Sequence, residues 1–214
     1  MTSLAQNGLL LDVQHVTMRF GGITAVNDLS MQIPTGSITG LIGPNGAGKT
    51  TFFNCITGIY LPTEGTVQLH LPERNGKPAS STTLNGMKPN EITELGMART
   101  FQNIRLFNNL SVEDNVKIGL HNQERYSAIT GVLRLPWYWS REKAAHERAL
   151  ELLSLFGMAD LADHQAGSLP YGAQRRLEIV RALATNPSLL LLDEPAAGMN
   201  PSETAELMEN IVKI

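Results

Sequence analysis

Four glycines precede one lysine in the stretch GLIGPNGAGKTTFFNCITG, residues 40–58. Gly43, Gly48, Lys49 and Thr50 match the spacing G-x-x-x-x-G-K-[ST], which is typical of loops that bind nucleotide phosphates. Glycines let successive backbone N–H groups converge on one anion, and a helix that starts there adds its positive dipole end. Lys49 would bring a positive charge to the β- and γ-phosphates, and the Thr50 hydroxyl could ligate Mg²⁺. The alternative is an ordinary glycine turn with an exposed lysine.

A second chemical element ends the apolar run LLLLDEP, residues 189–195. The run follows Pro187 and has the length of a buried strand, and open α/β sheets gather ligand groups at the carboxyl ends of their strands. Asp193 is therefore a candidate to hold Mg²⁺ through water, and Glu194 to orient and deprotonate an attacking water. The alternative is a strand-end turn with a solvated Asp-Glu pair. The glycine loop predicts binding, and Glu194 predicts hydrolysis.

The elements that position these residues can be read from hydrophobic periodicity. Residues 9–20 alternate partially and predict a strand that ends at Gly21 and Gly22. Two short strands are expected on either side of the turn at residues 34–36, the second over residues 38–42 and leading directly into the glycine loop. Residues 50–57 then read as a helix that Gly58 ends.

The rest of the chain changes from turn-rich to helical. Residues 62–87 predict strand edges and a surface loop, with hairpin signals at Asn75-Gly76 and Asn85-Gly86. Residues 141–157 predict an amphipathic helix, with one apolar stripe made of Ala145, Ala149, Leu152, Leu153 and Phe156. Residues 171–184 predict another helix. Strands that alternate with helices imply an α/β fold with a mostly parallel sheet, an antiparallel edge and an inserted helical subdomain.

Composition limits the functional classes. The chain has 214 residues, 42% of them hydrophobic, and a formal net charge of −3, which argues against a protein that binds nucleic acid. The single cysteine, Cys55, cannot form an internal disulfide. The amino terminus lacks a signal-peptide pattern, and no apolar run is long enough to span a bilayer. We expect a soluble, cytosolic chain that contacts a membrane only through a partner.

Five motifs in order resemble those of the ATP-binding subunits of ABC transporters, over essentially the whole chain. GPNGAGKT is similar to the Walker A loop, LPYGAQ to the signature motif and LLLLDE to Walker B. Gln102 in RTFQNIRLF falls at the Q-loop glutamine, and AAGMNP, residues 196–201, at the D-loop. Within the family, RTFQNIRLF, YGAQRRLEI and DEPAAGMNP look most like the ATPase subunit of branched-chain amino acid importers. The resemblance implies a P-loop NTPase of the ABC ATPase type.

The resemblance also implies roles for individual residues. Glu194 and Gln102 would be catalytic, and Thr50, Gln102 and Asp193 would hold Mg²⁺. Phe20 would stack on adenine, unless it is simply a core residue. Gln102 would otherwise be a solvated loop amide. The residues implied to bind ATP are Phe20, Gly43, Pro44, Asn45, Gly46, Ala47, Gly48, Lys49, Thr50, Thr51, Tyr171, Gly172 and Gln174.

The partners follow from the signature motif, whose helix start near Gly172 does not fold back onto its own Walker A loop in this family. The resemblance implies a head-to-tail pair with a second ABC ATPase subunit, identical or related, that sandwiches two ATP molecules. It further implies transmembrane permease subunits, an indirect link to a periplasmic substrate-binding protein, and a peripheral place on the cytoplasmic face of the bacterial inner membrane. Alternatives are a soluble ABC-type ATPase and a weakly hydrolysing regulatory module.

Four departures from the family pattern bear on activity. Pro170 replaces the signature serine, Ala173 replaces a glutamine, and Asn200 replaces the D-loop acid. The fourth is the end of the chain, which lies before the switch histidine, so we expect a single domain over residues 1–214 that is truncated at its carboxyl end. Its RecA-like core is expected over residues 1–88 and 176–214, with a helical subdomain over residues 89–175. Arg175 and Arg176 are predicted to face solvent.

Overall fold

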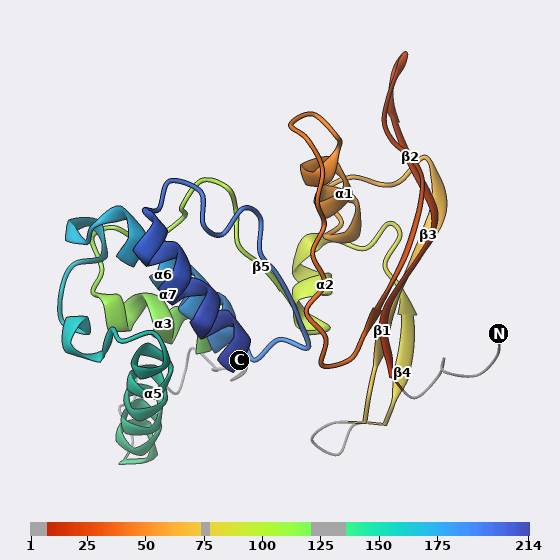
Figure 1. Cartoon of the computed structure of the whole chain (residues 1–214). Helices are drawn as coiled ribbons and strands as arrows, with labels where there is room; N and C mark the ends of the chain where they lie inside the picture. Colours follow the sequence, from red (N-terminus) through yellow and green to blue (C-terminus); the bar gives the residue numbers. More distant parts are fainter. Residues whose placement is uncertain (1–7, 74–77, 121–135) are drawn as a thin grey trace. The chain divides into compact units, whose positions relative to one another are not determined.

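The computed structural model describes residues 8–73, 78–120 and 136–214, without the side chains of residues 136–139. The chain forms two compact units, Met1–Met97 and Ala98–Ile214, which are described separately below (Figure 1). The predicted turn at Asn75-Gly76 lies outside the described residues. The division into a RecA-like core and a helical subdomain stays a prediction.

The first unit is built on a four-stranded sheet of β1 (Leu9–Phe20), β2 (Ile23–Pro34), β3 (Glu64–Leu71) and β4 (Ser80–Thr83), in the order β2-β1-β3-β4. All three neighbouring pairs are antiparallel. Strand β1 has the predicted bounds, and Gly21, with φ 56°, provides the turn into β2. The apolar residues of β1 and β3 fill the core of the unit, among them Leu11, Val13, Val16, Val67 and Leu69.

The strand predicted over residues 38–42 is not formed. This segment joins β2 to helix α1 (Lys49–Ile56) without strand structure, and the Ile42 side chain is 94% exposed. A strand needs a neighbour to pair its backbone N–H and C=O groups, and in the described part of the first unit β1 to β4 pair only with one another. The helix that follows begins and ends one residue before its predicted range, 50–57. Phe52, Cys55 and Ile56 are buried on its inner face. Burial raises the pKa of the Cys55 thiol.

Asn85-Gly86 forms a turn but not a hairpin. It leads from β4 to helix α2 (Pro89–Glu94), and Gly86 has φ 80°. The Asn85 side chain accepts from Val67 N–H at 2.8 Å and donates to the Gly65 carbonyl at 3.1 Å. The dipeptide predicts the turn correctly. The Asn85 side chain fastens this turn to β3, and the turn does not join a pair of hairpin strands.

The second unit is mainly helical. Strand β5 (Met97–Arg99) pairs with β6 (Leu189–Leu191), and helices α3 (Val112–Leu120), α5 (Pro136–Leu155), α6 (Tyr171–Ala184) and α7 (Pro201–Lys213) follow in chain order (Figure 1). Short 3₁₀ turns lie at Ala159–Leu161 and Ala166–Ser168. Ala145 of the predicted stripe is only half-buried, and Phe156 follows the last residue of α5, but Ala149, Leu152, Leu153 and Phe156 are all buried. They pack in one cluster with residues of α3, α6 and α7, including Val116, Leu177, Ile179 and Leu207.

Helix α7 begins at a capping box. The Asn200 side chain accepts from the Glu203 N–H at 2.9 Å, and the Glu203 carboxylate accepts from the Asn200 N–H at 2.9 Å. Pro201 takes the first helical position, where its missing N–H costs nothing. Asparagine followed by proline and, three residues after the asparagine, by glutamate is a sequence pattern that predicts a helix start. No helix in the described ranges combines the length and the hydropathy that a bilayer crossing requires.

Replacing Asn200 with alanine is expected to lower the free energy of unfolding by about 1 kcal/mol, because the loss of the Asn200 side chain leaves the Glu203 N–H without its acceptor. Urea denaturation followed by circular dichroism measures the change. Ser202→Ala, at an exposed position in the same turn, is the matched control and should differ from the wild-type chain by less than about 0.5 kcal/mol. Equal effects of the two substitutions would show that the capping box contributes nothing.

Candidate functional site

Two glycines of the loop adopt left-handed backbone conformations, which glycine accepts without steric cost. Gly46 has φ 82° and Gly48 has φ 84°, both in the left-handed region. A Cβ on Gly48 would overlap the carbonyl oxygen of Ala25 in β2, so this position tolerates no side chain. Helix α1 begins at the next residue, Lys49. The loop therefore leads into a helix N-terminus, where backbone N–H groups and the helix dipole favour an anion.

The Lys49 side chain folds back over the loop that precedes it. Its Nζ donates to the carbonyl oxygens of Gly43, at 2.6 Å, and Pro44, at 3.0 Å. Both acceptors are neutral, so the ammonium charge has no anionic counterpart in this contact. Thr50 is exposed and Thr51 is half-buried in the first turn of α1. The loop tip, Pro44, Asn45, Gly46 and Ala47, is exposed.

Phe20 lies at the end of β1 and is 42% exposed, which excludes the alternative that it is a core residue. Its ring meets that of Tyr60 edge to face, with the ring centroids 5.3 Å apart. Edge-to-face contact leaves a face of the Phe20 ring open to a planar ligand. An exposed aromatic held by a second ring is compatible with the predicted adenine stacking.

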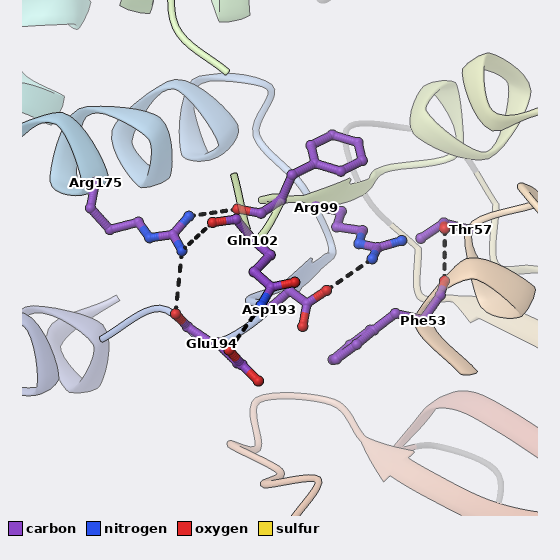
Figure 2. Close-up of polar contacts among 8 residues, drawn as sticks. Phe53, Thr57, Arg99, Gln102, Arg175, Asp193 and Glu194 are labelled. Carbon is purple, nitrogen blue, oxygen red and sulfur yellow. Dashed lines mark hydrogen bonds and ion pairs between the residues drawn. The ribbon is translucent and has the colours of Figure 1, made fainter. Parts of the chain in front are cut away.

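Asp193 lies in the second unit, two residues after β6, and is buried. Its Oδ2 accepts from Arg99 Nη2 at 3.0 Å, and the two side chains are only 5% and 7% exposed (Figure 2). Arg99 ends β5, the strand that pairs with β6, so the two-stranded sheet places both charges together. The charge of Asp193 is thus balanced by Arg99, which no local sequence pattern marks as its partner.

Glu194 has a backbone φ of 48°, in a region that costs a residue with a side chain about 1 kcal/mol or more. Its Oε2 accepts from Gln102 Nε2 at 3.3 Å (Figure 2). The two predicted catalytic residues, which are far apart in the sequence, are therefore in contact. The Gln102 side chain is exposed but is not simply a solvated amide.

Arg175 is fully buried, and the prediction that it faces solvent is wrong. Its guanidinium pairs with the Glu178 carboxylate at 2.9 Å and donates to the backbone carbonyls of Phe101, Gln102 and Glu194. A signal was present in the sequence: Arg175 and Glu178 are spaced i, i+3, which places opposite charges side by side on the helix, next to Leu177, Ile179 and Val180. A buried helix must pair such charges with each other or with the backbone. Arg176 is half-buried and pairs with Glu206.

The predicted signature residues lie at the start of α6. Tyr171 is 46% exposed and its ring lies against Gly198, whereas Gly172 is buried. A Cβ on Gly172 would lie 2.6 Å from Oε1 of Glu203, so a side chain there would displace the Glu203 carboxylate that caps α7. The Gln174 side chain donates to the carbonyl of Leu169 at 2.8 Å, so it fastens the helix start to the preceding segment.

The side chains of the described residues limit how a metal ion could be bound. Among the described residues, no cluster of three or more His, Cys, Asp and Glu side chains could hold an ion by itself. Mg²⁺ differs from such cases, because it is held by one or two carboxylates together with phosphates and water. In the second unit, the carboxylate of Asp193 and the amide oxygen of Gln102 are donors of the kind that fit this mode, and in the first unit the exposed Thr50 hydroxyl is another such donor.

Comparison with known proteins identifies the family. A protein-family model described as "ABC transporter" matches residues 26–197. The high-affinity branched-chain amino acid transport ATP-binding protein LivG of Salmonella typhimurium is 44% identical over 205 residues, which cover 96% of this chain and 76% of the relative. BraF of Pseudomonas aeruginosa, with the same description, is 40% identical over the same shares.

Solved structures agree. The ADP conformation of MJ1267, an ATP-binding cassette of an ABC transporter, superimposes with a TM-score of 0.76 at 29% identity and covers 96% of this chain and 76% of its own. The dimeric post-hydrolysis structure of the cassette MJ0796, bound to ADP and Pi, gives 0.72 at 25% identity over 94% and 81%. The family model, the relatives and the fold all agree with the ordered motifs and with the glycine loop, in which Gly46 and Gly48 have left-handed φ values. The chain therefore belongs to the ABC transporter family as an ATP-binding cassette.

Proposed function

We propose that this cassette hydrolyses ATP to power an importer of branched-chain amino acids. Two relatives that are at least 40% identical carry that transport function in their names, and the chain covers three quarters of their length. The observation that carries the catalytic part is the contact between Gln102 and Glu194, since it joins the two residues that an attacking water would need. The strained backbone of Glu194 supports the same role, because such strain is retained where function requires it.

The individual roles are proposed as follows. The loop N–H groups and Lys49 bind the phosphates of ATP, and Phe20 stacks on the adenine. Lys49 now binds only neutral carbonyls, which a triphosphate would replace with a stronger, charge-assisted contact. Thr50, Gln102 and Asp193 hold Mg²⁺, which would neutralise the charge of the transferred phosphoryl group. Glu194 takes a proton from the attacking water while Gln102 orients it.

The assembly is also proposed. One of the solved relatives is a dimer bound to ADP and Pi, which supports a pair of cassettes. Tyr171, Gly172 and Gln174 would contact the nucleotide held by the opposite subunit, which is identical or related. Permease subunits would hold the pair at the cytoplasmic face of the bacterial inner membrane, and a periplasmic substrate-binding protein would deliver the solute to them.

A weakly hydrolysing regulatory module is a second candidate. The observation that favours it is the N-cap of α6, where Pro170 offers no side-chain hydrogen bond. A serine there could give a hydroxyl to a phosphate, and Pro170 cannot. The measured turnover of the assembled complex separates the two candidates.

Lys49→Ala tests the proposal. The substitution should reduce Mg-ATP affinity by at least about 10-fold in calorimetry, because it removes the only full charge of the loop. Lys88→Ala, at an exposed lysine that caps α2 in the same unit, is the control and should leave the affinity unchanged. Wild-type protein that binds no Mg-ATP, or a Lys49 variant that binds as tightly as wild type, would refute nucleotide binding by this loop.

A further inference from the structure

The contacts of Arg175 connect three parts of the second unit that the proposed mechanism needs. Arg175 lies four residues after the start of α6, the helix that carries Tyr171 and Gly172. One amino group, Nη1, donates to the Phe101 carbonyl at 2.5 Å, and the other, Nη2, donates to the Gln102 carbonyl at 2.9 Å. Nη2 also lies 3.4 Å from the Glu194 carbonyl (Figure 2). One guanidinium thus binds the backbone of both residues whose side chains meet.

Glu178 completes the connection one turn further along α6. Its Oε2 accepts from Arg175 Nη1 at 2.9 Å, and its Oε1 accepts from the Arg105 backbone N–H at 3.3 Å. The buried pair therefore holds the segment 101–105 at Phe101, Gln102 and Arg105. The pair uses two carbonyl acceptors and one N–H donor that no strand or helix satisfies. The segment is held by this pair rather than by regular secondary structure.

We propose that Arg175, together with Glu178, is a positioning residue that sets the Gln102–Glu194 pair relative to the signature helix. Each cassette would then have a rigid link between two parts: the start of α6, which meets the nucleotide held by the opposite subunit, and its own Gln102–Glu194 pair. A shift of α6 would move the Gln102 and Glu194 carbonyls with the guanidinium, since a planar fork fixes the direction of its hydrogen bonds. The inference rests on the proposed roles of Gln102 and Glu194.

A purely structural role predicts a different result from a positioning role. A buried ion pair replaced by apolar residues of similar size is commonly neutral or stabilising, whereas removal of one partner leaves an unpaired buried charge. The double variant Arg175→Met/Glu178→Leu removes the unpaired charge that a single substitution leaves, but it does not replace the contacts to the backbone groups of residues 101–105 and 194. We therefore expect it to be more stable than Arg175→Met and less stable than wild type. If the pair only stabilises the fold, this variant recovers hydrolysis as it recovers stability.

The experiment uses the complete transporter and begins with wild type and Lys49→Ala. If wild type neither binds nor hydrolyses ATP, the proposed function fails, and that failure is seen before any Arg175 variant is compared. For Arg175→Met/Glu178→Leu we expect a urea midpoint between those of Arg175→Met and wild type, an ATP affinity of the folded complex within about twofold of wild type, and a kcat lower by at least about 10-fold. Arg176→Met, at the neighbouring arginine paired with Glu206, is the matched control and should retain kcat within about threefold.

A double-mutant cycle with Gln102 gives a second readout. Gln102→Ala should lower kcat strongly in the wild type but little in the Arg175→Met/Glu178→Leu background, because Gln102 is already misplaced there. A stable double variant with kcat within twofold of wild type, or fully additive effects, overturns the proposal. If the double variant does not fold, Arg175→Lys decides, since it keeps the charge for Glu178 but loses the fork: a fall in kcat of about fivefold supports positioning, and a wild-type kcat overturns it.

Discussion

Arg99→Met is expected to destabilise the second unit by about 3–5 kcal/mol, because it leaves the Asp193 carboxylate buried without its counter-charge. Arg99 and Asp193 are 7% and 5% exposed, so water cannot replace the lost partner without opening the structure. Methionine preserves most of the arginine stem, which separates the loss of charge from the loss of packing. Urea denaturation of the purified chain measures the difference.

Two further variants show whether the buried charge is the cause. Arg99→Met/Asp193→Leu removes both charges and should recover most of the lost stability, since an apolar pair needs no counter-charge. Arg148→Met breaks the exposed pair with Glu151 in α5, whose side chains are 56% and 65% exposed, and should cost less than about 1 kcal/mol. If Arg99→Met lowers the free energy of unfolding no more than Arg148→Met does, then Arg99 is not the group that compensates the buried charge of Asp193.

The parts of the fold that follow from local patterns could be predicted from the sequence. Strand β1, helix α6 and the capping box of α7 lie where alternation, helical periodicity and the Asn200-Pro201-Glu203 pattern place them. In each case the residues that form the element also carry its signal. The glycine loop belongs to this group, because Gly48 needs both a positive φ and the absence of a Cβ.

What the sequence did not reveal depends on neighbours that are distant in the chain. Residues 38–42 have the composition of a strand, but a strand is defined by its partner, and composition does not name one. The Asn85-Gly86 pair predicts a turn, whereas the element after the turn is decided by residues 89–94. Ionic contacts show the same limit: Arg99 and Asp193 are separated by 94 positions, and only the pairing of β5 with β6 brings them together.

The candidate site shows both cases. Asp193 and Glu194 are candidates from the sequence because an apolar run that ends in carboxylates is a local pattern. Arg175 was assigned to solvent because adjacent arginines usually lie on an exposed helix face. The buried pair with Glu178 could be inferred only from the i, i+3 spacing of the opposite charges, taken together with the neighbouring Leu177, Ile179 and Val180.

Glu194→Gln is expected to lower ATP hydrolysis by the complete transporter by about 10²–10⁴-fold, because an amide cannot accept the proton of the attacking water. The change preserves the size of the side chain, and the new amide oxygen can still accept from Gln102 Nε2. The contact with Gln102 should therefore be kept, whereas the side chain at position 194 can no longer act as a base. Mg-ATP affinity is expected to change by less than about threefold, since the phosphate loop is not altered.

The measurement is phosphate release at saturating Mg-ATP, compared with calorimetric binding to the same preparation. Glu209→Gln, at an exposed carboxylate on α7, is the control and should retain wild-type turnover. Unchanged hydrolysis in the Glu194 variant would assign the proton transfer to another group and would leave the strain at φ 48° without a catalytic reason. A parallel loss of ATP affinity would instead indicate that Glu194 stabilises the bound ATP before the reaction. Only a fall in kcat with intact affinity assigns Glu194 to the transition state, because that pattern isolates a contact made during reaction.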